Sequence, residues 1–431
     1  MNFDAPSGFL LTDCQNYCLR VADGTHETPT PTETGKKLAT SKSIKDGRLT
    51  LENFYRISDV EFEEINKRSK VDQWDILISM IGTVGEVCLI NDPEPDFAIK
   101  NVGLLKCGDQ IRGKWLYYFL RSPLAKSLIE ARKKGTTQQY ISLGEIRRFP
   151  VIFPENQEHM VDVVNFLSSL DDRITLLRET NATLEAIAQA LFKSWFVDFD
   201  PVRAKMEGRA PDSMDEATAA LFPDSFEESE LGLVPKGWCW KSLEDAYWIN
   251  PPRKLKKGEP APYIDMSSAP TQGHSPDAPV LREHGSGSKF QNGDTLLARI
   301  TPCLENGKSV FVDCLDDGQI AWGSTEFIVL KPKPPLPDYH AYLLCRHPAF
   351  REYAIQSMSG TSGRQRVQND VLGRFMIALP EAAIVEAFGA QVQAIQQKIS
   401  SNHQQAQTLA PLRDTLLPRL ISGQLRLPEA A

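Results

Sequence analysis

Apolar residues recur every three or four positions along two stretches of the chain, a spacing typical of long helices that pack along one seam. Each seam has polar exceptions, Asn181 in the first and Asn402 and Arg413 in the second. Pro411 predicts a kink or an interruption near the end of the second helix. The first seam consists of Leu167, Leu170, Ile174, Leu177, Asn181, Leu184, Ala188, Leu191 and Trp195, and the second of Val392, Ile395, Ile399, Asn402, Ala406, Leu409, Arg413, Leu416 and Leu420.

The two asparagines predict how the helices pair. Asn181 lies at heptad position a and Asn402 at position d, and a faces d only when two helices run antiparallel. Pairing the two amides removes most of the roughly 1–3 kcal/mol that a lone buried amide costs. We therefore expect an antiparallel coiled coil within the chain, with a plain helical hairpin as the alternative. The same register pairs Leu167 with Leu416, Leu184 with Ile399 and Trp195 with Phe388.

The chain also repeats itself at an offset of 225 residues. Leu105-Lys106 matches Leu330-Lys331, and Gly135-Thr136-Thr137 matches Gly360-Thr361-Ser362. Two copies indicate a tandem duplication. The parts beside the helices mix short β-type runs with Pro- and Gly-rich loops, which predicts an α+β fold of two similar domains and two long helices. We expect a first globular part at 1–154, a central helix with an acidic connector at 155–236, a second globular part at 237–380 and a distal helix at 381–431.

Charge is distributed unevenly between these segments. The whole chain has 431 residues and a net charge of −8, which by itself argues against nucleic acid as the partner. Segment 155–236 holds 7 basic and 17 acidic residues, whereas 1–154 holds 21 and 20 and 237–380 holds 16 and 15. The acidic excess therefore belongs to the central helix and connector, and each globular part is slightly basic.

Basic residues cluster beside the repeated turns of the two globular parts. Gln pairs with adenine and Arg with guanine in the major groove, and glycine lets the backbone approach phosphate. These turns are therefore candidate DNA-binding sites, against the alternative that each cluster is only a solvated face. The candidates are Lys133, Lys134, Gly135, Thr136, Thr137, Gln138, Gln139, Arg299, Gly360, Thr361, Ser362, Arg364, Gln365 and Arg366.

No catalytic centre, cofactor cradle or metal site can be assembled from the sequence. Asn250-Pro251-Pro252-Arg253 resembles the motif of amino-methylating DNA enzymes, but Arg253 stands where an aromatic residue should stack on a flipped base. Gly82-Thr83-Val84-Gly85 indicates a strand-end turn. The eight cysteines are scattered, so buried reduced thiols in a cytoplasmic protein are expected. We expect neither a signal peptide nor a membrane span.

Along its whole length the chain resembles the specificity (S) subunits of Type I restriction–modification systems. The most telling stretches are residues 183–202, residues 221–226 with Glu230-Leu231-Gly232, and Gly323-Ser324-Thr325-Glu326-Phe327. Further stretches of resemblance are residues 23–26, 74–87, 135–143, 293–308 and 363–367. The family pattern usually has Gly before the Asp of one strand motif, as in Gly293-Asp294, whereas here Trp74 precedes Asp75.

The resemblance implies two target-recognition domains that each read half of a split DNA sequence, with the helices as a spacer. It implies no catalysis and no cofactor, two methyltransferase (M) subunits docked on the chain, and restriction (R) subunits that join that core. The acidic connector and its aromatic side chains become a candidate docking surface, with simple packing of the helix end as the alternative. These aromatic residues are Trp195, Phe196, Phe199, Phe222 and Phe226.

Two other functions compete with this interpretation. A self-sufficient DNA adenine methyltransferase would bind S-adenosylmethionine as an isolated chain. A coiled-coil scaffold without DNA contact would show no sequence-dependent DNA binding at low salt.

Overall fold

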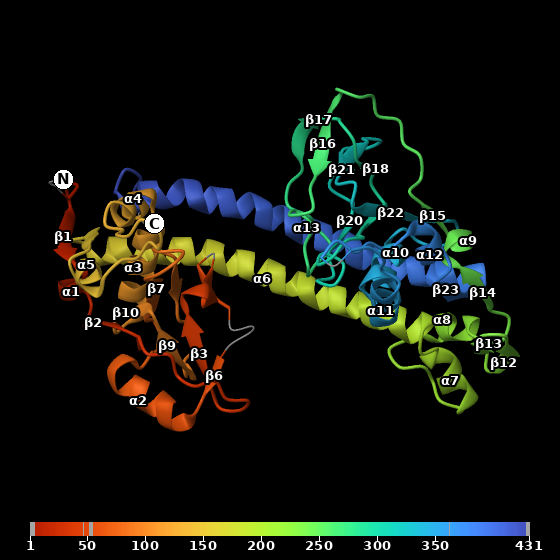
Figure 1. Ribbon diagram of the computed structural model, residues 1–431, viewed down its shortest axis with the longest axis horizontal. Coiled ribbons are helices and arrows are strands. Elements are labelled where there is room, and N and C mark those ends of the chain that lie inside the picture. Colours follow the sequence, from red (N-terminus) through yellow and green to blue (C-terminus); the bar gives the residue numbers. More distant parts are fainter. Residues whose placement is uncertain (1–4, 46, 51–54, 362, 428–431) are drawn as a thin grey trace. The chain divides into compact units, whose positions relative to one another are not determined.

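The computed structural model describes residues 5–45, 47–50, 55–361 and 363–427 (Figure 1). Contacts divide the chain into two compact units, each containing helices and short strands. Unit 1 comprises residues 1–174 and 408–431, and unit 2 comprises residues 175–407. The boundary falls inside the two long helices, so each unit contains part of both.

The elements of unit 1 precede the first long helix. In chain order they are β1 (Phe9–Asp13), α1 (Cys14–Tyr17), β2 (Arg20–Asp23), β3 (Lys36–Thr40), η1 (Ser41–Ser43), β4 (Ile44–Lys45), β5 (Arg48–Leu49), β6 (Tyr55–Ile57), α2 (Asp59–Ser69), β7 (Ile76–Ser79), β8 (Val87–Leu89), β9 (Phe97–Lys100), β10 (Val102–Lys106), α3 (Gln110–Arg121), α4 (Pro123–Glu130), α5 (Leu143–Arg147) and β11 (Pro150–Pro154).

The first long helix is α6 (Gln157–Phe196), and the elements that follow it belong to unit 2 up to the second long helix. They are α7 (Asp200–Met206), α8 (Glu216–Leu221), β12 (Phe226–Ser229), β13 (Gly232–Pro235), β14 (Cys239–Ser242), α9 (Leu243–Ala246), β15 (Tyr247–Ile249), β16 (Pro260–Ile264), β17 (Val280–Glu283), β18 (Ser288–Phe290), β19 (Thr295–Ala298), β20 (Ser309–Phe311), β21 (Ala321–Gly323), β22 (Phe327–Pro332), α10 (Tyr339–Arg346), α11 (Pro348–Gln356), α12 (Asn369–Gly373), β23 (Met376–Leu379) and α13 (Ala382–Ile421).

The duplication seen in the sequence is present in the strand pairing of the two units. Unit 1 has an antiparallel sheet in the order β2-β10-β7-β8, and unit 2 has one in the order β15-β22-β19-β20. Leu105 pairs with Ile76 in the first sheet and Leu330 pairs with Thr295 in the second, which is the same register in both copies. A second sheet repeats as well, because β3 pairs in parallel with β9 and β16 pairs in parallel with β21.

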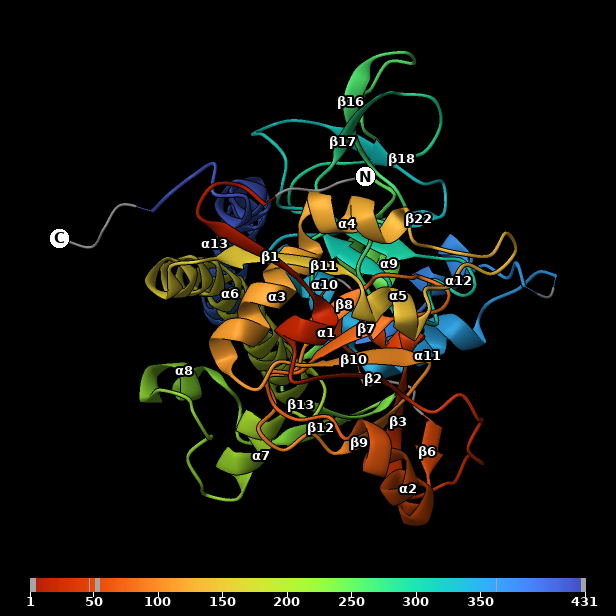
Figure 2. The ribbon, with the colours of Figure 1, turned by 90° about the vertical axis from the view of Figure 1, so that its left-hand side faces the viewer.

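In unit 1 the core lies between the sheet and the helices α3, α6 and α13 (Figure 2). Trp115 and Phe119 of α3 are fully buried, and Trp115 Nε1 donates to the carbonyl oxygen of Ile152 in β11 at 2.7 Å. Val164 and Leu167 of α6 join the same core together with Leu420 of α13. Arg413, the charged exception of the second seam, forms an ion pair with Asp171 in which Nη1 and Oδ1 lie 2.5 Å apart.

In unit 2 the two long helices also pack against each other in opposite directions. Asn402 Nδ2 donates to Asn181 Oδ1 at 2.9 Å, and the rings of Trp195 and Phe388 lie 5.5 Å apart between centroids. Asn181 Nδ2 also donates to the carbonyl oxygen of Ile399 at 3.0 Å. The asparagine pair and the Trp195–Phe388 contact predicted from the heptads are therefore both present.

Two expectations from the sequence need correction. The predicted interruption at Pro411 is absent, because α13 continues to Ile421 with Pro411 inside it. Pro411 and Gln407 are exposed, so water can satisfy the carbonyl that loses its helical hydrogen bond. All eight cysteines are free thiols as expected, but Cys239 and Cys314 are exposed and only five are buried.

Candidate nucleic-acid interface

The repeated turns form two equivalent exposed loops. Loop 1 is Lys134–Tyr140, in which the backbone N–H of each end residue donates to the carbonyl of the other at 2.9 Å. Loop 2 is Ser359–Arg366, where the equivalent hydrogen bonds measure 3.0 and 2.9 Å. A pair of backbone hydrogen bonds therefore closes each loop at its base.

Each loop is also tied to the segment that follows a central strand of its sheet. The N–H of Ile141 donates to the carbonyl of Met80 at 2.9 Å, and the N–H of Val367 donates to that of Arg299 at 3.0 Å. Isolated bridges join Ile81 to Tyr140 and Ile300 to Arg366. Tyr140 and Arg366 therefore occupy equivalent places in the two units.

Glycine is needed at the start of each loop for a steric reason. Gly135 has a φ of 90° and Gly360 a φ of 130°, where a side chain is strained. A Cβ on Gly135 would lie 2.3 Å from the carbonyl oxygen of Gln138. The two glycines thus make the tight turns possible. That they also let the loop backbone approach a DNA phosphate stays a prediction.

In loop 1 the exposed side chains are mostly neutral. Thr136, Thr137, Gln138 and Gln139 are exposed. Lys134 is exposed as well, with its Nζ 3.7 Å from Glu145 Oε1. The side chain of Lys133, which precedes loop 1, is only 17% exposed, and its Nζ lies 2.5 Å from Glu130 Oε2. Lys133 is therefore the least available of the candidates in unit 1.

In loop 2 the exposed side chains include a guanidinium. Gly360, Thr361 and Arg364 are exposed and Gln365 is half-buried, whereas Ser362 lies outside the described residues. Arg299 is half-buried, and its Nη2 donates to Gln368 Oε1 at 3.2 Å.

Arg366 forms an ion pair that the sequence did not reveal. Its Nε lies 3.0 and 2.9 Å from the two carboxylate oxygens of Glu326, and its Nη2 donates to Oε1 at 2.6 Å. The hydrogen bond from Arg366, together with the charges of Arg366 and Arg299, holds the pKa of Glu326 below its ordinary value. Glu326 was visible only as part of a family stretch, because 40 residues separate the two partners in the chain.

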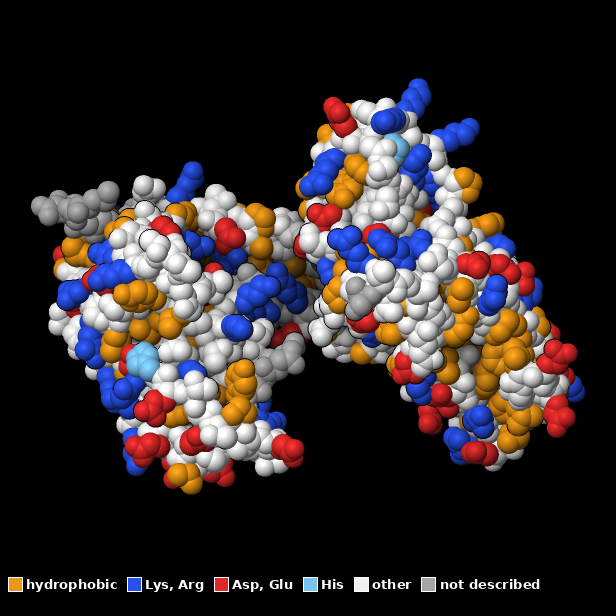
Figure 3. All heavy atoms as spheres, viewed as in Figure 1, with side chains coloured by type: hydrophobic (Ala, Val, Ile, Leu, Met, Phe, Trp, Pro, Cys, Tyr) orange, Lys and Arg blue, Asp and Glu red, His pale blue; other side chains and the backbone are white. Residues whose placement is uncertain are grey.

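Further basic side chains gather on unit 2 over the antiparallel pair β16–β17 (Figure 3). Lys254, Lys256, Lys257 and Arg282 are exposed there. Arg253 belongs to the same sequence cluster but is bound in an ion pair, with Nη2 2.9 Å from Oδ1 of the fully buried Asp294.

The Asn-Pro-Pro-Arg stretch has a structural role at the end of β15. Asn250 has a φ of 52°, and its Oδ1 accepts a hydrogen bond from the N–H of Val329 at 2.9 Å. The amide oxygen thus takes the place of a strand partner. Gly82-Thr83-Val84-Gly85 is the turn between β7 and β8, as predicted.

The aromatic side chains predicted as a docking surface are mostly buried. Trp195, Phe196, Phe199 and Phe222 are between 2% and 6% exposed and belong to the core of unit 2. Only Phe226 is half-buried, with Arg203 packed 5.2 Å from its ring centroid. The burial of these four residues favours the alternative given for them, simple packing of the helix end.

The connector folds back against the end of α6, and this explains why these aromatic side chains are buried. Phe199 takes a left-handed conformation with a φ of 56°, and α7 begins directly after it. The rings of Trp195 and Phe222 then meet edge to face at 5.0 Å. Exposed in this region are Glu227, Glu228 and Glu230 with Leu231 and Leu233, which we call the acidic hairpin.

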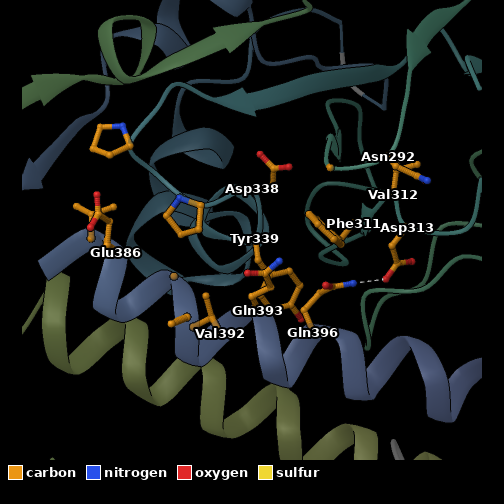
Figure 4. Close-up of a pocket in the computed structure, with 16 residues that line it drawn as sticks. Asn292, Phe311, Val312, Asp313, Asp338, Tyr339, Glu386, Val392, Gln393 and Gln396 are labelled. Carbon is orange, nitrogen blue, oxygen red and sulfur yellow. Dashed lines mark hydrogen bonds between the residues drawn. The ribbon is translucent and has the colours of Figure 1, made fainter. Parts of the chain in front are cut away.

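A groove of about 640 Å³ lies in unit 2 between α13, the loop before α10 and the end of β20 (Figure 4). Asp313, Asp338 and Glu386 line it, so its charge is unfavourable for phosphate. Gln396 Nε2 donates to Asp313 Oδ2 at 2.7 Å, and Ser400 also donates to this oxygen. These hydrogen bonds hold the segment after β20 against α13. We therefore interpret the groove as a consequence of this packing and not as a binding site.

Within the described residues, no group of three or more His, Cys, Asp or Glu side chains could hold a metal ion. None of the described helices combines the length and apolar character needed to cross a membrane.

Comparisons with known proteins fit these loops and sheets. Residues 31–186 match the family model described as the Type I restriction modification DNA specificity domain. The chain is 26% identical over 362 residues to the Type I restriction enzyme HindI specificity subunit of Haemophilus influenzae, covering 69% of this chain and 73% of that protein. It is 24% identical over 339 residues to the MjaIX specificity subunit of Methanocaldococcus jannaschii, covering 74% of this chain and 71% of that protein.

The fold is also similar to a solved structure. The crystal structure of a Type I restriction–modification S subunit from M. genitalium superposes with a TM-score of 0.55 at 16% identity, covering 100% of this chain and 99% of that one. The family model and the relatives agree: residues 31–186 match the DNA specificity domain, and over most of its length the chain is similar to the specificity (S) subunits of Type I restriction–modification systems.

Proposed function

We propose that this chain is the DNA-recognition subunit of a Type I restriction–modification complex, and that units 1 and 2 each read one half of a split target. One observation carries the proposal: two sheets with the same strand order and register each hold an exposed, hydrogen-bonded loop rich in groups that bind bases or phosphate. The duplicated design explains why one chain would read two half-sites.

The long helices would connect the two readers as an antiparallel coiled coil and fix the number of bases between the half-sites. The Asn181–Asn402 pair and the Asp171–Arg413 pair support this role, because both hold α6 and α13 in one register. A fixed register is what a spacer requires, since slippage would change the distance between the readers.

Two methyltransferase subunits would dock on the chain, and restriction subunits would join that core. The buried aromatic residues support docking only indirectly, by holding the connector on the end of α6. The acidic hairpin offers the exposed surface instead, because it combines Leu231 and Leu233, 54% and 63% exposed, with three glutamates. A basic surface on the partner would complement it.

The test is DNA binding by the purified complex with Arg364 replaced by alanine. If Arg364 reads a base, affinity falls by about 1–3 kcal/mol for targets with the correct base and much less for others. A similar loss on every sequence would identify a phosphate contact, which also supports DNA binding. Arg209→Ala is the matched control, because Arg209 pairs with Glu207 on the exposed surface of unit 2. The proposal fails if the unchanged complex shows no sequence-dependent binding at low salt.

A further inference from the structure

The two loops are equivalent in backbone but differ in chemistry at their last residue. Tyr140 closes loop 1 and Arg366 closes loop 2, each bridged to the segment that follows a central strand. Tyr140 is 43% exposed and the side chain of Arg366 is 39% exposed. One place in the duplicated fold thus presents a phenol in unit 1 and a guanidinium in unit 2.

The ion pair with Glu326 leaves one edge of the Arg366 guanidinium open. Glu326 takes the edge formed by Nε and Nη2. Among the described residues, the edge formed by Nη1 and the second N–H of Nη2 is engaged only by the carbonyl oxygen of Arg364, which lies 3.5 Å from Nη1, at the outer limit of a hydrogen bond. Two parallel N–H groups on that edge match the O6 and N7 acceptors of guanine.

Glu326 also fixes where this edge points. Its backbone is held on both sides, since its N–H donates to Ser324 Oγ at 3.1 Å and its carbonyl accepts from the N–H of Arg299 at 2.9 Å. A guanidinium that is already oriented loses less side-chain entropy when it binds. The carboxylate neutralises much of its charge and would repel a phosphate, so the pair suits a base edge better than the DNA backbone.

Loop 1 offers no such group. Between Gly135 and Tyr140 its side chains are threonine and glutamine, which are neutral. Glutamine can pair with adenine through its amide but cannot present two donors to guanine.

We propose that Arg366, positioned by Glu326, reads a guanine in the half-site recognised by unit 2, and that the half-site of unit 1 has no equivalent guanine contact. This inference rests on the proposed function, and it adds the class of base that one reader selects. Arg366 is the contacting residue, and Glu326 is a positioning residue.

The experiment replaces single guanines in the mapped target by 7-deazaguanine, which lacks the N7 acceptor but keeps Watson–Crick pairing. Affinities are measured with the purified complex of this chain and its methyltransferase subunits. The two hydrogen bonds from an arginine to guanine together discriminate against the wrong base by about 5- to 150-fold in affinity. The replacement removes one of the two, so the expected loss of affinity is about 3- to 10-fold. We expect it at one guanine of one half-site and at no guanine of the other.

Variants assign that guanine to the loop. With Arg366→Ala or Arg366→Lys the complex binds its target DNA more weakly, and replacing the guanine by 7-deazaguanine lowers the affinity no further. Glu326→Gln reduces the effect of 7-deazaguanine without lowering affinity for unrelated DNA, because it removes a negative charge. Arg209→Ala leaves the effect unchanged.

The inference is overturned if no guanine of a specifically bound target is sensitive to the replacement, or if the sensitivity persists in both Arg366 variants. Loss of sequence-dependent binding by the unchanged complex would instead remove the proposed function, and the inference with it.

Discussion

The pairs of residues directly before β7 and β19 differ in sequence between the two copies, but the packing around them is similar. Asp75 and Asp294 are both buried, and each follows a residue in the left-handed region, Trp74 with a φ of 69° and Gly293 with a φ of 84°. In unit 2 a Cβ on Gly293 would lie 2.3 Å from Asp338 Oδ2. In unit 1 the residue equivalent to Asp338 is Gly113, which leaves room for Trp74. The departure from the family pattern at Trp74 is therefore compensated by Gly113.

This exchange predicts the cost of a side chain at Gly293. Gly293→Ala should destabilise the chain by more than the roughly 1–2 kcal/mol of left-handed strain, because Asp338 and its partner Lys331 must also move. Gly258→Ala is the matched control, since Gly258 has a φ of 81° and a Cβ added there would meet nothing within 4 Å. Equal losses of unfolding free energy in urea would contradict the clash.

His340 makes the stability of the chain depend on pH. It is fully buried in unit 2, with Phe196 and Phe388 against its ring, and burial lowers its pKa from 6.5 to about 3. Below pH 6.5 the unfolded chain binds a proton that the folded chain does not, so stability is present above that pH and is lost as the pH falls towards 3. The expected loss is roughly 1.4 kcal/mol per pH unit.

Unfolding in urea at pH 7, 6 and 5 measures this loss. His340→Gln should flatten the pH dependence of the unfolding free energy by about one proton, even if the variant is less stable throughout. An unchanged slope in His340→Gln would show that the proton is taken up elsewhere.

At the scale of elements, the long helices depend on polar pairs inside an apolar seam. Asn402 is 2% exposed, and its amide donates to Asn181. Asn402→Leu should cost about 1–3 kcal/mol, because Asn181 Oδ1 loses its donor inside the seam. The double variant Asn181→Leu/Asn402→Leu should recover most of that loss. A double-mutant cycle in urea checks this prediction, and simple addition of the two single losses would show that the pair is not coupled.

The helices and their register could be predicted because heptad spacing is a local property of the sequence. The same holds for the duplication, whose matching residues pair in one register in both copies. Exposure could not be predicted in this way: Trp195 and Phe222 sit in an acidic stretch but meet in the core, because Phe199 turns the chain back. The ion pair of Arg366 with Glu326 was also missed, since the partners come together only through the sheet and loop 2.

At the scale of the whole molecule, each unit fastens its globular part to the long helices through polar contacts. In unit 1, Tyr118 Oη of α3 donates to Asp171 Oδ2 of α6 at 2.9 Å. In unit 2, Tyr342 Oη of α10 donates to Glu185 Oε1 of α6 at 2.6 Å. The two tyrosines are not at equivalent positions, because Tyr342 matches Tyr117 in the duplication and the contact in unit 1 is made by the next residue, Tyr118. Two units built alike, each fastened to the long helices, fit the proposal that each unit reads one half of a split target.

Genome-wide mapping of methylated adenines, in cells that express this chain together with its methyltransferase subunits, tests that claim most directly. The account predicts one split motif: two short specific halves separated by a fixed number of unspecified bases. Omitting this chain should abolish the methylation, and Arg364→Ala should relax or weaken only one half. A continuous motif, or methylation that does not depend on this chain, would contradict the account.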